Sequence, residues 1–182
     1  GKDVTRLKVG DRIASLPAVG CGQCAACLAG FPVQCANGVR SQIAGFAEYI
    51  AVAEAGATVL PQAVTIADGA LVEPLSVGLH GVALANIFPG ARIAVVGAGS
   101  VGLAAIFWAR QMGAGRIVAT SPSARRAELA MSMGADAFET MGEGDGERIN
   151  RALGGQPDIV FECAGAVGAT GKSVDLVKNN GL

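Results

Sequence analysis

Near its middle the chain reads Ile93-Ala94-Val95-Val96-Gly97-Ala98-Gly99-Ser100-Val101-Gly102. The four apolar residues predict a buried strand, and the G-x-G-x-x-G pattern behind them predicts a tight turn into a helix. Gly97 then makes the turn, Gly99 lets the backbone approach a pyrophosphate, and Gly102 brings the helix close to the strand. The N–H groups at the helix start, around Ser100 and Val101, favour phosphate charge. An ordinary glycine-rich turn is the alternative, but a strand before and a helix after favour a dinucleotide site.

The chain around this stretch alternates between strand and helix patterns. Strands are predicted at 93–96, 116–120, 137–139 and 158–163, and helices at about 100–112, 123–133, 146–153 and 167–178. This βαβ series predicts a parallel, doubly wound Rossmann sheet. A further helix is predicted at about 74–86, with Pro74 in its first turn. Residues 179–182 fall where another strand should begin, so we expect the chain to be a fragment.

The end of the second strand bears on the choice of coenzyme. An acidic residue there would receive the ribose 2′-hydroxyl of NAD. This chain instead has Ser121, Ser123, Arg125 and Arg126 after the strand. Hydroxyl groups and guanidinium groups can bind a 2′-phosphate, so NADP is favoured over NAD, although a solvated helix face would also explain the two arginines.

Four cysteines with the spacing Cys-x2-Cys-x2-Cys-x7-Cys lie in a segment with few large apolar residues: Cys21, Cys24, Cys27 and Cys35. Four thiolates can close around one Zn²⁺ tetrahedrally, which leaves no position for substrate and makes such a site structural. Two disulfides are the alternative, but they need an oxidising compartment, and cysteines this close pair poorly. We therefore expect a structural zinc and a cytoplasmic protein.

Composition excludes several classes of function. The chain has 182 residues, 51% of them hydrophobic, and its 14 Lys and Arg residues against 15 Asp and Glu residues give a net charge of −1. A zinc ribbon that binds nucleic acid would need a basic surface, so no nucleic acid partner is expected. The uncharged run at 93–109 is short and broken by glycines, so we expect no membrane span.

The first third of the chain is predicted to be β-rich and irregular, with strands near 12–14 and 45–52. We expect two domains. Residues 1–75 carry the zinc lobe at 21–35, and residues 76–182 form the dinucleotide-binding part.

Several motifs in combination resemble the zinc-containing medium-chain dehydrogenases, and most closely their polyol (sorbitol-type) and threonine branch. They are the cysteine lobe and the segments 45–49 (Gly-Phe-Ala-Glu-Tyr), 70–80 (Ala-Leu-Val-Glu-Pro-Leu-Ser-Val-Gly-Leu-His) and 97–103 (Gly-Ala-Gly-Ser-Val-Gly-Leu). The resemblance extends over essentially the whole chain. It implies a GroES-like β-barrel domain before the Rossmann domain, with the active site between them.

In this family a second, catalytic zinc polarises the alcohol oxygen, and its cysteine and His-Glu ligands are expected before Gly1. The resemblance implies that Glu73 approaches that zinc directly or through water. The alternative for Glu73 is a helix N-terminal carboxylate stabilised by the dipole. His80, the only histidine, is predicted to be a packing residue at the domain junction, and Cys163 a small core residue.

The resemblance thus implies a zinc-dependent oxidoreductase that transfers a hydride between a secondary alcohol or polyol and NAD(P), with the fragment itself inactive. A dimer or tetramer is expected by analogy. A non-catalytic dinucleotide-binding protein and a zinc-independent quinone reductase remain as alternatives.

Overall fold

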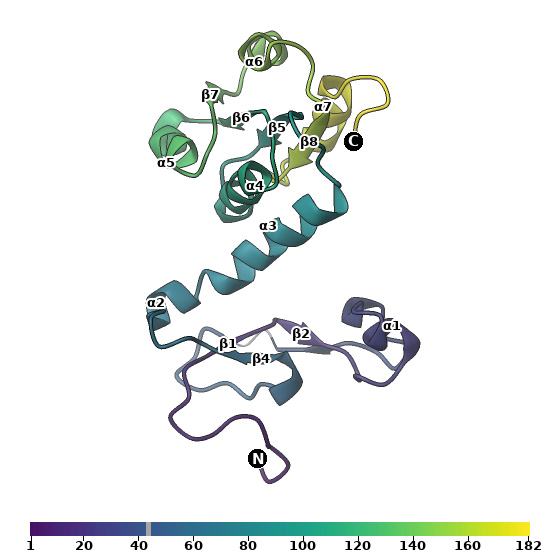
Figure 1. Cartoon of the computed structure of the whole chain (residues 1–182), viewed down its shortest axis with the longest axis vertical. Helices are drawn as coiled ribbons and strands as arrows, with labels where there is room; N and C mark the ends of the chain where they lie inside the picture. Colours follow the sequence, from purple (N-terminus) through teal and green to yellow (C-terminus); the bar gives the residue numbers. More distant parts are fainter. Residues whose placement is uncertain (43–44) are drawn as a thin grey trace. The chain divides into compact units, whose positions relative to one another are not determined.

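The computed structural model describes residues 1–42 and 45–182. The chain divides into two compact units, Gly1–Glu73 and Pro74–Leu182, and Figure 1 traces the chain through both. Each unit is treated by itself below.

The second unit is built on a parallel sheet of four strands in the order β7-β6-β5-β8. The strands are β5 (Arg92–Val96), β6 (Arg116–Ser121), β7 (Ala137–Thr140) and β8 (Ile159–Glu162). The register pairs Ile93 with Ile117 on one side and with Ile159 on the other. At the far edge of β8, the backbone of Leu182 bonds Asp158 O and Val160 N, as a parallel neighbour would. The parallel doubly wound sheet expected from the sequence is confirmed.

Helices cover both faces of this sheet (Figure 1). They are α3 (Val72–Leu84), α4 (Ser100–Gln111), α5 (Ala127–Ser132), α6 (Asp145–Leu153) and α7 (Ala169–Leu176). One core packs alternate strand residues such as Ile93 and Ile117 against α4 and α5. The other packs Ala94 and Val118 against α6. The reversal of strand order between β5 and β8 therefore opens a crevice at the carboxyl ends of the strands, where α/β proteins bind ligands.

Two predicted helices differ from the structure at their starts. The helix expected at 123–133 begins as a 3₁₀ turn, Ala124–Arg126, and becomes α-helical only at Ala127. The helix expected from 167 begins at Ala169, because Gly165 and Gly168 adopt left-handed φ angles of +62° and +80°. Local turn geometry shortens both helices.

Close packing between α3 and α4 depends on a glycine. A Cβ at Gly78 would lie 2.6 Å from the Cβ of Ala104 and 2.9 Å from backbone atoms of α4. Trp108 Nε1 donates a hydrogen bond of 2.9 Å to Leu75 O and ties the same two helices together. The helix predicted near 74–86 thus exists and packs on α4 through small residues.

A buried carboxylate closes the amino end of the sheet. Asp158 is 7% exposed and accepts hydrogen bonds from the backbone N–H of Arg92, at 2.7 Å, and from Lys178 Nζ, at 2.6 Å. Burial raises the pKa of Asp158, but the bonds from Lys178 and Arg92 lower it more, to about 2 against an ordinary 3.8. The charged form is therefore the form that the fold stabilises.

The variant Asp158→Asn is expected to lose about 2 kcal/mol of unfolding free energy at neutral pH. Because the folded pKa is depressed, this contribution is complete above pH 4 and fades as the pH falls toward 2. Urea unfolding at several pH values measures it. The control Glu139→Gln breaks a more exposed pair with Arg148 and should cost less than about 1 kcal/mol. Equal losses in both variants would contradict the role of Asp158.

The first unit has short strands in two small antiparallel sheets. One pairs β1 (Ile13–Ser15) with β4 (Ala57–Val59), and the other pairs β2 (Ala18–Val19) with β3 (Arg40–Ser41). The short helices are α1 (Ala25–Leu28) and α2 (Ile66–Gly69), with 3₁₀ turns at Pro32–Gln34 and Glu54–Gly56. Thr65 and Asp68 form a capping box at the start of α2. The irregular character expected of this part is confirmed, but the expected richness in β-structure is not, because its described strands are only two or three residues long.

One predicted strand is wrong. Residues 45–52, all of which the structure describes, form bends and extended chain without sheet pairing. Phe46 and Tyr49 are fully or almost fully exposed. Their apolar alternation would make a strand only beside a pairing partner and a core, and this segment has neither here.

No helix among the described residues is long and apolar enough to span a bilayer.

Candidate functional site

The four predicted zinc ligands meet at one point of the first unit. The Sγ atoms of Cys21, Cys24, Cys27 and Cys35 lie within 4.8 Å of one another. Cys24 Sγ and Cys35 Sγ are 4.0 Å apart. Tetrahedral thiolates with Zn–S of 2.3 Å require S···S separations of about 3.8 Å, so the thiols already stand close to the geometry of a closed Zn²⁺ site. All five cysteines of the chain are free thiols, and the structure gives the disulfide alternative no support.

Hydrogen bonds to sulfur polarise this cluster. The N–H groups of Gln23 and Cys24 and the Asn37 Nδ2 point at Cys21 Sγ, at 3.3 to 3.5 Å. They lower the pKa of Cys21, the Gln23 bond most, to about 6. At Cys27 the bond from the Gly22 N–H lowers the pKa, but desolvation and the neighbouring thiols raise it more, to about 11. Anions crowded this closely need a cation between them, as Zn²⁺ would supply.

A glycine before the first cysteine keeps the cluster compact. A Cβ at Gly20 would lie 2.5 Å from Cys27 Sγ, 3.0 Å from Pro32 O and 3.2 Å from the Cβ of Cys35. All three distances are too short for ordinary contacts. The sequence showed this residue only as one glycine among many, and the need for it arises from sulfur atoms that reach it from elsewhere in the loop.

Gly20→Ala is expected to push Cys27 Sγ out of place and weaken zinc affinity by roughly tenfold or more. Competition with a chromogenic chelator measures this affinity. Gly171→Ala is the matched control, since a Cβ there meets open space in α7. If both variants hold zinc equally well, the packing argument for Gly20 fails.

The glycine turn between β5 and α4 contains two residues that the fold itself requires to be glycine. Gly97 has φ +100°, and a Cβ there would lie 2.6 Å from Ala164 N. A Cβ at Gly102 would lie 1.9 Å from Gly97 O. At Gly99, by contrast, a Cβ would meet nothing within 4 Å. Packing against the described residues therefore does not require glycine at position 99, unlike positions 97 and 102.

A cavity of about 330 Å³ opens at this turn. Six of the predicted coenzyme residues line it: Gly97, Gly99, Ser121, Ser123, Arg125 and Arg126. Ser100, Val101 and Gly102 lie in the first turn of α4 and do not line it. Free N–H groups at the start of a helix, hydroxyl groups and guanidinium groups together suit phosphate.

Two side chains hold the walls of this cavity in ways that the sequence did not reveal. Arg126 Nη1 donates to Ala98 O at 3.0 Å. Glu162 Oε1 accepts from the N–H groups of Ala164 and Gly165, at 2.7 and 2.9 Å. The Arg126 bond joins residues 28 positions apart, which only the folded chain brings together. The Glu162 bonds are local, since they reach N–H groups two and three residues further along the chain.

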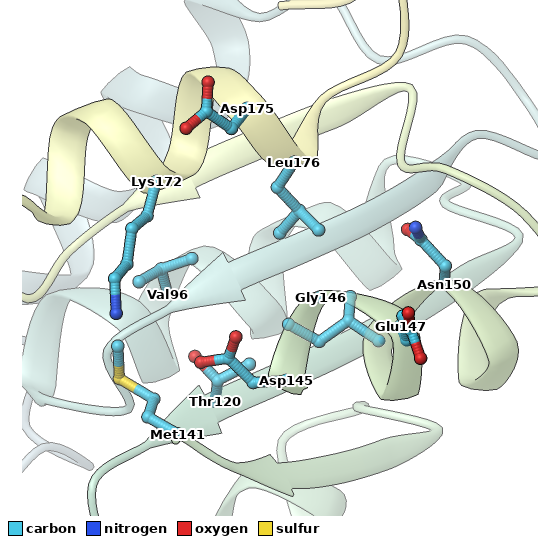
Figure 2. Close-up of a pocket in the computed structure, with 11 residues that line it drawn as sticks. Val96, Thr120, Met141, Asp145, Gly146, Glu147, Asn150, Lys172, Asp175 and Leu176 are labelled. Carbon is cyan, nitrogen blue, oxygen red and sulfur yellow. The ribbon is translucent and has the colours of Figure 1, made fainter. Parts of the chain in front are cut away.

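A second cavity, of about 370 Å³, lies at the carboxyl ends of the strands between α6 and α7 (Figure 2). Its walls include Val96 at the end of β5, Thr120 near the end of β6, and Met141 just beyond β7, with Leu176 from α7. Charged side chains at its margin are Asp145, Glu147, Lys172 and Asp175 (Figure 2). Thr120 is 1% exposed, and among the described residues neither its Oγ1 nor Asn150 Oδ1 has a hydrogen-bond partner. The cavity is thus apolar at its centre, with unsatisfied polar atoms beside it.

The remaining candidates lie outside these sites or at their edge. Glu73 is an exposed residue in the first turn of α3 and belongs to no metal-binding group among the described residues. His80 is also exposed, so its predicted packing role is wrong. Cys163 packs against the core of α4 and α5 as expected, and burial raises its pKa to about 11, which leaves it an unreactive thiol.

Comparison with known families matches both parts of the chain. Residues 1–62 match the alcohol dehydrogenase GroES-like domain, and residues 100–182 match a family described as zinc-binding dehydrogenase.

Individual proteins are similar over most or all of the chain. Sorbitol dehydrogenase of Bacillus subtilis is 34% identical over 100% of this chain and 53% of its own length. Galactitol 1-phosphate 5-dehydrogenase of Escherichia coli is 40% identical over 74% of this chain and 40% of its own length. A solved zinc-binding dehydrogenase of Sinorhizobium meliloti bound to NADP is 34% identical, with a TM-score of 0.86 over 100% of this chain and 55% of that one. The chain therefore spans about half the length of the curated relatives that it matches.

Proposed function

The chain belongs to the zinc-containing medium-chain alcohol dehydrogenase family, and we propose that the whole protein transfers a hydride between a secondary alcohol or polyol and NAD(P). The main support for this proposal is that one chain holds both a glycine turn suited to a pyrophosphate and four thiols close enough together to bind one zinc ion. The names of the relatives, a sorbitol and a galactitol 1-phosphate dehydrogenase, point to polyols as the substrate class.

Structural zinc is proposed at Cys21, Cys24, Cys27 and Cys35. Its contribution is to hold residues 21–35, which contain a single buried side chain, that of Cys35. With four protein ligands the ion has no open position, so it takes no part in the reaction. The catalytic zinc would polarise the alcohol oxygen in the family's chemistry. Glu73 is proposed as its oxygen ligand or as a partner of a bound water, a role that its exposed position leaves available.

The coenzyme is proposed to lay its pyrophosphate on the backbone of Gly97 and Gly99 and on the N–H groups of Ser100 and Val101. Because residue 102 is a glycine, α4 can begin close to the end of β5, so that these N–H groups can reach the pyrophosphate. When bound, the nicotinamide accepts or gives the hydride. The protein's own part is to bind and orient the coenzyme at the end of the sheet.

The adenosine end is proposed to reach the second cavity. Ser121, at the end of β6, lines the first cavity and is proposed to meet the ribose 2′-position; the preceding residue, Thr120, lines the second cavity. A flat base fits between the apolar side chains of Val96 and Met141. With Ser123, Arg125 and Arg126 near the ribose and no carboxylate between residues 121 and 127, NADP is proposed as the preferred coenzyme.

The alternatives are less well supported. A quinone reductase without zinc would have no use for the thiol quartet, and the relatives named above are polyol dehydrogenases. The same names weigh against a non-catalytic dinucleotide-binding protein. A homo-oligomer is proposed by analogy with the family, and a cytoplasmic location because thiolate zinc sites require reduced cysteines.

The test is a coupled assay of the full-length, zinc-loaded protein with a panel of polyols and with NADP or NAD. Reduction of the coenzyme by one or more polyols, lost in Glu73→Ala and kept in His80→Ala, is expected. Coenzyme binding without turnover of any alcohol would favour the non-catalytic alternative.

A further inference from the structure

We infer that the two neighbouring arginines at the coenzyme cavity have different tasks, with Arg126 positioning the glycine turn and Arg125 reading the 2′-phosphate. This inference rests on the proposed coenzyme function and refines it. Taken alone, the sequence makes the two residues equivalent, since both follow the same strand and both carry one positive charge.

The side chain of Arg126 is hydrogen-bonded to the glycine turn. Its Nη1 donates a hydrogen bond of 3.0 Å to the carbonyl oxygen of Ala98. Ala98 is 2% exposed and lies between the two glycines that would carry the pyrophosphate. The turn is also bonded to β6, from Gly97 N to Thr120 O at 2.9 Å, whereas Arg126 reaches it from the 3₁₀ turn that follows β6. Arg126 therefore spans 28 residues of sequence to fix the carbonyl at the centre of the turn.

Arg125 has the opposite character. It is exposed, and within residues 1–42 and 45–182 no hydrogen bond or ion pair reaches its side chain. It lines the same cavity as Ser121 and Ser123. All five of its N–H donors are thus available for an anion, and a free guanidinium next to two hydroxyl groups fits a phosphomonoester.

Loss of each arginine should have a different effect on the affinity for NAD. The pyrophosphate is common to NAD and NADP, so loosening the turn weakens both coenzymes by the same factor. The 2′-phosphate is present only in NADP, so loss of its partner weakens NADP alone. The ratio of the Kd for NAD to the Kd for NADP therefore distinguishes the two roles. A general loss of stability does not change this ratio.

The experiment titrates NADP and NAD calorimetrically into the full-length, zinc-loaded protein and its variants. Arg125→Ala is expected to raise the Kd for NADP roughly 10- to 100-fold and to leave that for NAD within about twofold. Arg126→Ala is expected to raise both about tenfold with the ratio unchanged. If the ratio of the Kd for NAD to the Kd for NADP falls more in Arg126→Ala than in Arg125→Ala, the inference is overturned.

Hydrogen exchange in the absence of coenzyme provides a second readout. Amides of residues 97–102 should exchange faster in Arg126→Ala than in the parent, and at the parent rate in Arg125→Ala. If the parent bound neither coenzyme, the proposed function would fail, and the exchange rates would still decide whether Arg126 holds the turn. Equal exchange in the parent and in Arg126→Ala would refute that role.

Discussion

Substitution of Cys24 by serine is expected to remove one zinc ion per chain and to unfold the loop around it. The segment from Cys21 to Cys35 has one buried side chain, that of Cys35 itself. Its order must therefore come from metal–ligand bonds, which in small zinc modules amount to about 10 kcal/mol or more. A hydroxyl group in place of one thiolate cannot replace a soft ligand. Metal analysis together with hydrogen exchange over residues 20–36 measures both consequences.

The fifth cysteine supplies the matched control. Cys163 lies in the second unit and packs against the core of α4 and α5. Cys163→Ala removes a sulfur of the same kind without touching the quartet, so the zinc content and the exchange of residues 20–36 should match those of the parent. A Cys24→Ser variant that retained the full zinc content, with a protected loop, would rule out the quartet as the zinc site.

Adding one methyl group at Gly102 is expected to destabilise the second unit by about 3 kcal/mol or more. The new Cβ would stand 1.9 Å from Gly97 O, well inside contact distance, and both atoms belong to the backbone segment that joins β5 to α4. Neither the strand nor the helix can shift without disturbing the core on that face. Thermal unfolding of Gly102→Ala, without coenzyme, measures the loss.

Gly99→Ala separates folding from binding in the same turn. Its Cβ meets no protein atom within 4 Å and its φ of −76° suits alanine, so the unfolding free energy should stay within about 0.5 kcal/mol of the parent's. The methyl group would, however, occupy the path of the pyrophosphate, and the Kd for either coenzyme should rise roughly 10- to 100-fold. An unchanged Kd in this variant would mean that the coenzyme does not approach Gly99.

The second unit could be predicted well because its signals are local. Apolar runs such as 93–96 and 117–119 are buried on both faces of a parallel sheet, so each run identifies a strand by itself. The glycine turn has physical tasks that one short segment performs. The cysteine spacing was equally informative, because four ligands within 15 residues can reach one ion whatever the rest of the chain does.

Apart from the two helix starts, which local turn geometry changed, the failures involve partners distant in sequence. The pattern at 45–52 predicted a strand, yet pairing is decided by a neighbouring strand that the segment does not have here. His80 was placed in a packed junction and is exposed, since one helix position gave no information about its surroundings. The bond from Arg126 to Ala98 and the cavity between α6 and α7 depend on elements that meet only when the sheet is assembled.

The most direct test of the whole account is a calorimetric titration of the folded, zinc-loaded, full-length protein with NADP. We predict one coenzyme bound per chain with a micromolar Kd, and weaker binding of NAD in a parallel titration. The absence of any heat of binding for either coenzyme at millimolar concentration, from protein shown to be folded, would contradict the assignment of the glycine turn as a dinucleotide site.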